Sequence, residues 1–123
     1  MNTYPKKVEL VEVGPRDGFQ SIKEFIPTEL KKEIIDRLVA AGCTTVQVTS
    51  FVHPKAIPQM QDAKEVAQYV LEKYPALRAY ALVPNLRGAQ NAYEAGLREI
   101  SYVISVSPGH NMANVRRTLE ESF

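Results

Sequence analysis

The chain has 123 residues, of which 45% are apolar and 24% charged, proportions typical of one soluble globular domain. Fifteen basic and fourteen acidic residues leave a net charge of +1, which argues against nucleic acid or an anionic membrane surface as partner. The single cysteine, Cys43, rules out an internal disulfide and fits a reducing compartment. Because no apolar signal core or membrane-length apolar run is present, we expect a cytoplasmic protein with one domain over residues 1–123.

Four short apolar segments alternate with longer segments of helical spacing. The short ones are rich in Val, Ile or Tyr and predict strands at Val8–Val13, Thr45–Thr49, Arg78–Val83 and Ile100–Val106. The longer ones predict helices at Thr28–Ala41, from Asp62 to just before Pro75, at Asn85–Ala95, and from near Met112 to the last residue. Strands alternating with helices favour parallel pairing with right-handed crossovers, which is the α/β class.

Particular residues predict where these helices begin and end. Thr28 and Asn85 are expected N-caps, and Asp62 is expected to open a capping box. Gly42 and Gly96 each follow an alanine and precede a strand, so both are expected to end a helix.

The number of repeating units suggests a barrel. Four βα units match half of a (β/α)8 barrel, which takes about 250 residues. The last helical pattern reaches Phe123 without a cap. Half a barrel leaves two open sheet edges. We therefore expect the remainder of a barrel, or another copy in a homo-oligomer, to cover them.

Polar residues follow each predicted strand. The string Gly14-Pro15-Arg16-Asp17-Gly18-Phe19-Gln20 follows the first, Ser50 and His53 the second, Asn85 the third, and Ser105, Ser107, His110 and Asn111 the fourth. In a parallel sheet these positions share one rim, where ligands bind. This mixture suits a small, anionic, oxygen-rich ligand, with or without a divalent cation.

Each of these side chains also has a purely structural interpretation. Asp17 is either a metal ligand or a loop residue paired with Arg16. Arg16 either stabilises a developing oxyanion or enolate, or is structural. Gln20 and Ser50 either contact a ligand or hydrogen-bond a loop. No phosphate-binding glycine loop, Ser-His-Asp spacing, CxxC or HExxH is present, so hydrolase, nicotinamide-binding and zinc-finger functions gain no support.

The string Val11–Gln20 closely resembles the first strand of the 3-hydroxy-3-methylglutaryl-CoA lyase family, a group of metal-dependent TIM-barrel lyases and synthases. The resemblance continues through Thr49–Lys55, Ile57–Met60, Val83–Gly88 and Glu120–Phe123. It implies a (β/α)8 barrel of which this chain is the N-terminal half. The implied reaction is retro-Claisen cleavage of a branched 3-hydroxyacyl-CoA to acetyl-CoA and a β-keto acid.

The resemblance also implies roles for single residues. Asp17 would be a ligand of a divalent cation, Mg or Mn. Arg16 would be the catalytic stabiliser of the enolate or carbonyl and would bind substrate. Gln20 and Ser50 would be substrate-binding residues on the same rim.

Three departures separate this chain from the family pattern. Gln47 stands where members usually carry Glu, Ser107-Pro108 stands where Ser-Glu is expected, and the His-x-His ligands with the reactive-cysteine loop belong to the second half of the barrel. We therefore expect the isolated chain to be inactive. Two alternatives remain: an acyl-CoA-dependent synthase or aldolase, against which Gly14-Pro15 argues, and a non-catalytic, self-associating half-barrel.

Overall fold

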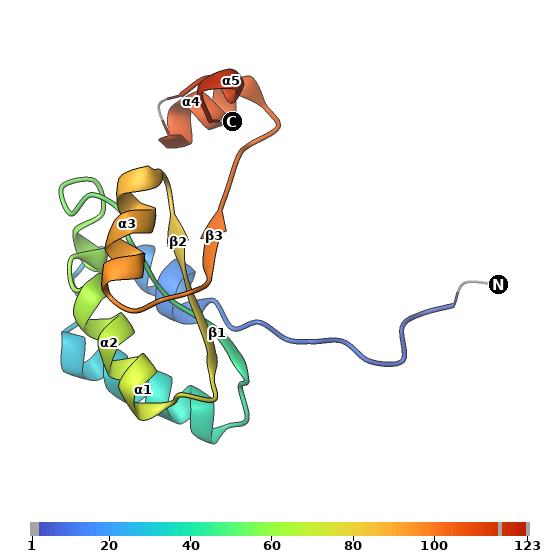
Figure 1. Ribbon diagram of the computed structural model, residues 1–123, viewed down its shortest axis with the longest axis vertical. Coiled ribbons are helices and arrows are strands. Elements are labelled where there is room, and N and C mark those ends of the chain that lie inside the picture. Colours follow the sequence, from blue (N-terminus) through green and yellow to red (C-terminus); the bar gives the residue numbers. More distant parts are fainter. Residues whose placement is uncertain (1–2, 116, 123) are drawn as a thin grey trace.

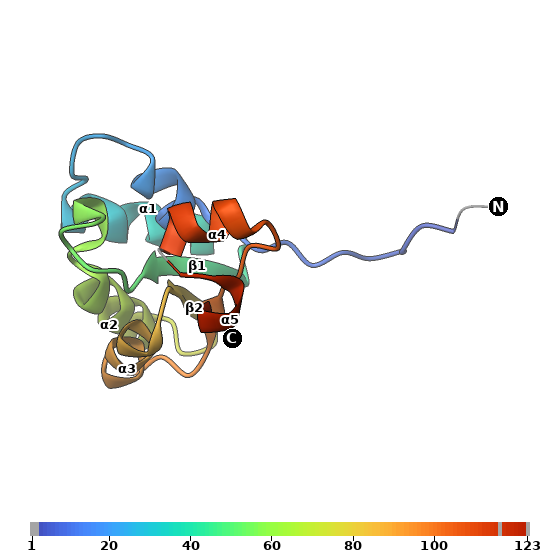
Figure 2. The same cartoon turned by 90° about the horizontal axis from the view of Figure 1, so that it is seen from above.

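The computed structural model describes residues 3–115 and 117–122. Its sheet contains three parallel strands in the order β1 (Thr45–Ser50), β2 (Arg78–Val83) and β3 (Ile100–Tyr102). Helices α1 (Thr28–Ala40), α2 (Ala63–Lys73) and α3 (Leu86–Glu94) cover one side of this sheet (Figures 1 and 2). The parallel pairing and the strand–helix alternation confirm the predicted α/β class.

The core lies between the sheet and these helices. Val46 and Val48 of β1 pack with Val66 and Val70 of α2, and each of the four side chains is at most 1% exposed. Small residues of the strands and of α3 complete the layer, among them Ala79, Ala81 and Ala92. Burying such a layer is the main source of stability for the fold. Among the described residues, no helix combines the length and the apolarity that crossing a membrane requires.

The predicted first strand, Val8–Val13, is wrong in extent. Only Glu12 forms a bridge: its N–H donates to the Thr45 carbonyl (3.0 Å), and its own carbonyl accepts from the Gln47 N–H (2.8 Å). The preceding segment projects from the body of the molecule (Figure 1), and Val8 and Leu10 are 68% and 81% exposed. No described residue packs against these apolar side chains. Because side-chain packing stabilises strand pairing, the pairing with β1 does not extend from Glu12 toward the N-terminus.

The predicted C-terminal elements are also corrected. The last strand, β3, ends at Tyr102 rather than at Val106, and within the described part of the chain β2 is its one partner. Two short helices, α4 (Pro108–Val115) and α5 (Leu119–Ser122), replace the single expected helix. Pro108 explains the early start, because proline suits the first turn of a helix and cannot extend a strand ladder. Residues 116 and 123, within the expected helix, lie outside the described residues.

Three of the predicted helix boundaries are confirmed. The Asn85 side chain caps α3 by accepting a hydrogen bond from the Gly88 N–H at 2.8 Å. Gly42 and Gly96 adopt φ angles of 103° and 105°, each one residue beyond the C-cap alanine that follows α1 or α3. Such left-handed angles are ordinary for glycine and costly for other residues, so both positions require glycine.

Asp62 occupies the predicted N-cap position of α2, whereas Pro27 rather than Thr28 is the N-cap of α1. The capping hydrogen bonds predicted for both side chains are wrong, because both make a tertiary contact instead. Neither forms a capping hydrogen bond. The Thr28 hydroxyl donates to Asp62 Oδ2 at 2.8 Å, and Lys31 Nζ lies 2.7 Å from Asp62 Oδ1. The Lys31 ammonium also donates to the Gln59 carbonyl and lies 4.6 Å from the centre of the Phe25 ring. This buried cluster joins α1 to the start of α2 and to the loops at residues 20–27 and 51–62.

A second cluster, around Asp36, joins α1 to the end of α2. Asp36 accepts hydrogen bonds from the hydroxyls of Tyr69 (2.8 Å) and Tyr74 (2.6 Å) and pairs with Lys73 at 3.2 Å. Partial burial by itself would raise the pKa of the Asp36 carboxyl, but these three partners outweigh it and hold the pKa below its ordinary value of 3.8. The charged carboxylate is therefore the form that the fold stabilises.

We expect this cluster to make the stability of the chain depend on pH. Since the pKa of Asp36 is lower in the folded than in the unfolded state, the carboxylate contributes stability at pH values above about 3.8, and this contribution is lost as the pH falls through the folded pKa. In urea unfolding, Asp36→Asn should thus be more destabilising at neutral pH than near pH 3. The exposed control Glu33→Gln should show a smaller pH dependence. An equal effect of Asp36→Asn at both pH values would contradict this expectation.

Candidate functional site

A short helical turn at the end of the Glu12 bridge positions the predicted Arg-Asp pair. The turn η1 (Gly14–Gly18) has π-helical hydrogen bonding, and Pro15 within it is buried. The backbone N–H groups of Arg16 and Asp17 both donate to the Val13 carbonyl, at 3.1 and 2.8 Å. The pair therefore stands on a rigid turn at the edge of the sheet rather than on an open loop.

Arg16 is the most strongly held polar side chain at this edge. Its Nε donates to Gln47 Oε1 of β1 at 2.6 Å, and its Nη1 donates to Asp17 Oδ1 at 3.0 Å. The Arg16 side chain is 20% exposed, whereas that of Asp17 is 67% exposed. The guanidinium is thus anchored on one side and accessible on the other, which is the arrangement that an anion-binding arginine requires.

Arg16 lines a cavity of about 780 Å³ beyond the carboxyl ends of the strands. The wall comes from η1, from the loop after β1, from the end of β2 with the start of α3, and from the C-terminal region. Its residues are Arg16, Gln20, Val52, His53, Lys55, Ala56, Ile57, Leu82, Val83, Pro84, Asn85, Val103 and Ala113. The volume is within the range of small-molecule sites, and the position confirms that these segments share one rim.

Two polar groups in this wall have distinct local roles. Gln20 lines the cavity, and its Oε1 is buried and has no hydrogen-bond partner among the residues that the structure describes. His53 Nδ1 accepts from the Lys55 N–H at 3.1 Å, which assigns the ring proton to Nε2 in the neutral form. Arg16 and Lys55 make the rim cationic.

Two other predicted site residues lie outside the cavity wall. Asp17 is beside Arg16 but points mainly to solvent. Ser50 is completely buried, and its hydroxyl donates to the Leu82 carbonyl at 3.2 Å. In this conformation Ser50 therefore supports the floor of the rim by joining β1 to β2.

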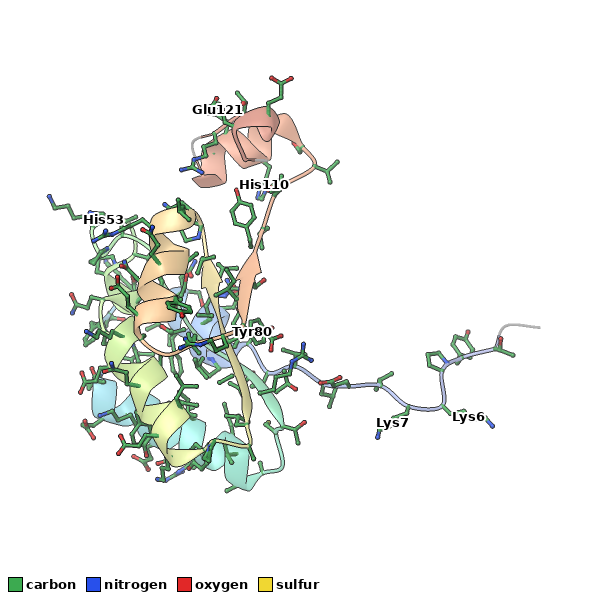
Figure 3. The ribbon with its side chains drawn as sticks, in the orientation of Figure 1. Lys6, Lys7, His53, Tyr80, His110 and Glu121 are labelled. Carbon is green, nitrogen blue, oxygen red and sulfur yellow. The ribbon has the colours of Figure 1, made fainter. Side chains whose placement is uncertain are left out.

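The histidines of the rim lie on separate segments. His110 of α4 contacts the Ser105 hydroxyl, and its backbone N–H lies 3.4 Å from the Ser107 hydroxyl. Figure 3 shows His53 on the loop beside α3 and His110 on the segment beyond β3, with a clear separation between them. Each histidine is therefore accounted for by local contacts, and the two do not form one paired site.

A divalent cation requires more ligands than this region provides. Asp17 offers a hard carboxylate oxygen, which suits Mg or Mn. Among the described residues, however, no group of three or more His, Cys, Asp or Glu side chains is arranged to hold a metal ion. The residues present therefore do not form a cation site by themselves, and Asp17 fits only as one member of a larger ligand set.

Sequence reasoning missed two features of the site. The contact between Gln47 and Arg16 spans 31 positions and leaves no local pattern. The close approach of α3 to the end of β1 was also missed: a Cβ on Gly88 would lie 2.6 Å from the Phe51 carbonyl oxygen. The glycine three positions after the capping Asn85 was the one available signal for this approach.

Comparison with known families and proteins shows which family this chain belongs to. A family model described as HMGL-like matches residues 7–123. The chain is 46% identical over 119 residues to the mitochondrial hydroxymethylglutaryl-CoA lyase of Arabidopsis thaliana, covering 97% of this chain and 25% of that protein. It is 42% identical over 123 residues to the mitochondrial hydroxymethylglutaryl-CoA lyase of Homo sapiens, covering 100% and 38%.

Solved structures agree with these sequence matches. The HMG-CoA lyase of Bacillus subtilis matches with a TM-score of 0.89 and 44% identity, covering 97% of this chain and 40% of that one. An HMG-CoA lyase of A. baumannii, in complex with coenzyme A and 3-methylmalate, matches with a TM-score of 0.90 and 37% identity, covering 100% and 40%. The chain thus spans less than half the length of these relatives. The two solved lyases are TIM barrels. This chain belongs to the HMGL-like family and has the fold of the first βα units of a TIM barrel.

Proposed function

We propose that this chain forms the N-terminal, substrate-binding part of a carbon–carbon lyase that cleaves a 3-hydroxyacyl-CoA, as hydroxymethylglutaryl-CoA lyase does. The observation that carries the proposal is the position of Arg16, anchored by Gln47 and open to the cavity, in a chain similar over its whole length to such lyases. The cationic rim supports an anionic ligand rather than an apolar one.

The proposed reaction divides one carbon chain in two. The 3-hydroxyl group loses its proton, the bond between carbons 2 and 3 breaks, and its electron pair passes into the thioester as an enolate. Carbon 3 becomes the ketone of the keto acid, and protonation of the enolate carbon gives acetyl-CoA. The enolate is the costly species, so a fixed cation beside its oxygen lowers the barrier most.

Two residues of this chain have direct roles in the proposal. Arg16 stabilises the negative oxygen through the part of its guanidinium that faces the cavity. Gln20, which lines the cavity, contacts the substrate after its side-chain amide turns to expose the unpartnered Oε1. Ser50 stabilises the rim beneath them, and we propose that it contacts substrate only after its bond to Leu82 is broken.

A divalent cation, Mg or Mn, is a further part of the proposal, with Asp17 as one ligand. When bound, such an ion supplies Lewis-acid polarisation of substrate oxygens. The remaining ligands must come from residues other than those described here. The exposed apolar side chains of Val8, Leu10 and Ile100 also support coverage of this chain by the remainder of a barrel or by a second copy.

A chimeric enzyme tests the proposal. Residues 1–123 replace the corresponding segment of the Bacillus subtilis lyase, and acetyl-CoA release from 3-hydroxy-3-methylglutaryl-CoA is measured with Mg or Mn present. We expect the chimera to release acetyl-CoA and the isolated 123-residue chain to release none. A folded chimera that consumes acetyl-CoA and a keto acid but does not cleave would instead support a synthase.

A further inference from the structure

Gln47 makes two contacts with the segment that carries Arg16. Its backbone N–H donates to the Glu12 carbonyl at 2.8 Å, and its side-chain Oε1 accepts from Arg16 Nε at 2.6 Å. Gln47 lies within β1 and is 4% exposed, and the pairing of β1 with β2 shifts register directly after it. One buried residue of β1 therefore contacts both the backbone just before the turn and the Arg16 side chain that the turn carries.

These contacts determine which edge of the guanidinium is available. Arg16 Nε donates its hydrogen bond to Gln47, and Arg16 Nη1 donates to Asp17 at 3.0 Å. Nη2 makes no hydrogen bond to any described residue, and Arg16 lines the cavity. A planar guanidinium held at Nε cannot turn freely, so its Nη edge is presented in a constant direction.

The chemistry of the anchor also determines the charge of the site. An amide accepts the hydrogen bond without neutralising the arginine, whereas a buried carboxylate at the same place would form an ion pair with it. Asp17 neutralises Arg16 only weakly, because it is 67% exposed and water screens the pair. Lys55 adds a second positive charge to the cavity wall.

We propose that Gln47 is the positioning residue of Arg16, and that its neutral amide keeps the cavity cationic and selective for ligands with an anionic oxygen. This inference deepens the proposed function, on which it rests for the identity of the site. In this respect Gln47 differs from the Glu that members of the family usually carry at this position, because a buried carboxylate would pair with Arg16 and offset its charge, whereas the amide leaves that charge to the ligand.

The experiment uses the ¹⁵N-labelled 123-residue chain and the NMR signal of the Arg16 Nε–Hε group. Gln47→Leu removes the acceptor, Gln47→Glu keeps an oxygen acceptor and adds a charge, and Gln68→Leu is the matched control at an exposed glutamine of α2. We expect slow hydrogen exchange of Arg16 Hε in the unsubstituted chain, Gln47→Glu and Gln68→Leu, and fast exchange in Gln47→Leu. Slow exchange in a folded Gln47→Leu chain would overturn the positioning role.

Titration with inorganic phosphate at constant ionic strength, followed by the same signal, tests the charge. We expect Gln47→Glu to bind phosphate about tenfold more weakly than the unsubstituted chain, and Gln68→Leu to bind it equally well. Equal affinity in Gln47→Glu, or no response of Arg16 to phosphate, would overturn the charge role, even if Gln47→Leu does not fold. Phosphate binding without binding of 3-hydroxy-3-methylglutaryl-CoA would instead contradict the proposed function and leave the role of Gln47 supported.

Discussion

Replacing Lys31 with methionine is expected to lower the free energy of unfolding by about 3 kcal/mol. The Lys31 and Asp62 side chains are 3% and 7% exposed and lie 2.7 Å apart. Methionine fills a similar volume but leaves the Asp62 carboxylate buried, with the neutral Thr28 hydroxyl as its one remaining side-chain partner among the described residues. An unpaired buried charge is costly because water can no longer solvate it. Chemical denaturation of the two chains at neutral pH measures the difference.

Two further variants separate burial from the simple loss of a charge. Arg37→Met removes an exposed ion pair with Glu33 from the same helix and should change stability by less than about 0.5 kcal/mol. The double variant Lys31→Met with Asp62→Leu removes both buried charges and should be less destabilised than the sum of its two single variants. A loss for Lys31→Met as small as that for Arg37→Met would show that the Lys31–Asp62 contact is not formed in solution.

Replacing Arg16 with methionine in the chimeric enzyme is expected to lower kcat about 100-fold. The proposed enolate oxygen faces the Nη edge of Arg16, so the interaction strengthens as negative charge develops on the substrate. Removal of such an interaction reduces kcat and kcat/KM together, whereas loss of ordinary substrate binding would raise KM alone. Steady-state kinetics with 3-hydroxy-3-methylglutaryl-CoA distinguishes the two patterns.

The same chimera carries the control for this experiment. Arg37→Met removes an arginine of equal size from the exposed surface of α1, where the side chain is 79% exposed, and should leave kcat unchanged. Arg16→Lys keeps the positive charge, but an ammonium group cannot hydrogen-bond Gln47 and face the cavity at the same time as the planar guanidinium does. We therefore expect Arg16→Lys to have a kcat between those of Arg16→Met and the unsubstituted chimera. A kcat within twofold of the unsubstituted chimera for Arg16→Met would exclude Arg16 from the catalytic step.

The accuracy of the sequence-based predictions depended on the distance over which each interaction acts. The strand Arg78–Val83 and the cap at Asn85 were confirmed because they arise from residues close in sequence. Thr28 and Asp62 also have the residue types of caps, yet each contacts a partner more than thirty positions away. A local rule cannot represent that competition. The tertiary contact prevails because the Lys31 ammonium is buried and Asp62 is its carboxylate partner.

The sequence by itself determined the order of strands and helices from residue 28 to residue 102, the parallel sheet, the rim at its carboxyl end and the placement of Arg16 on that rim. Periodicity and turn residues specify these features, and the string around Arg16 specifies the family. Only the tertiary structure decided that Ser50 is buried, that Val8–Val13 forms a single bridge, and that Gln47 holds Arg16. Each of these depends on which strand lies beside which, and in what register, because burial and long-range hydrogen bonds exist only after the sheet has formed.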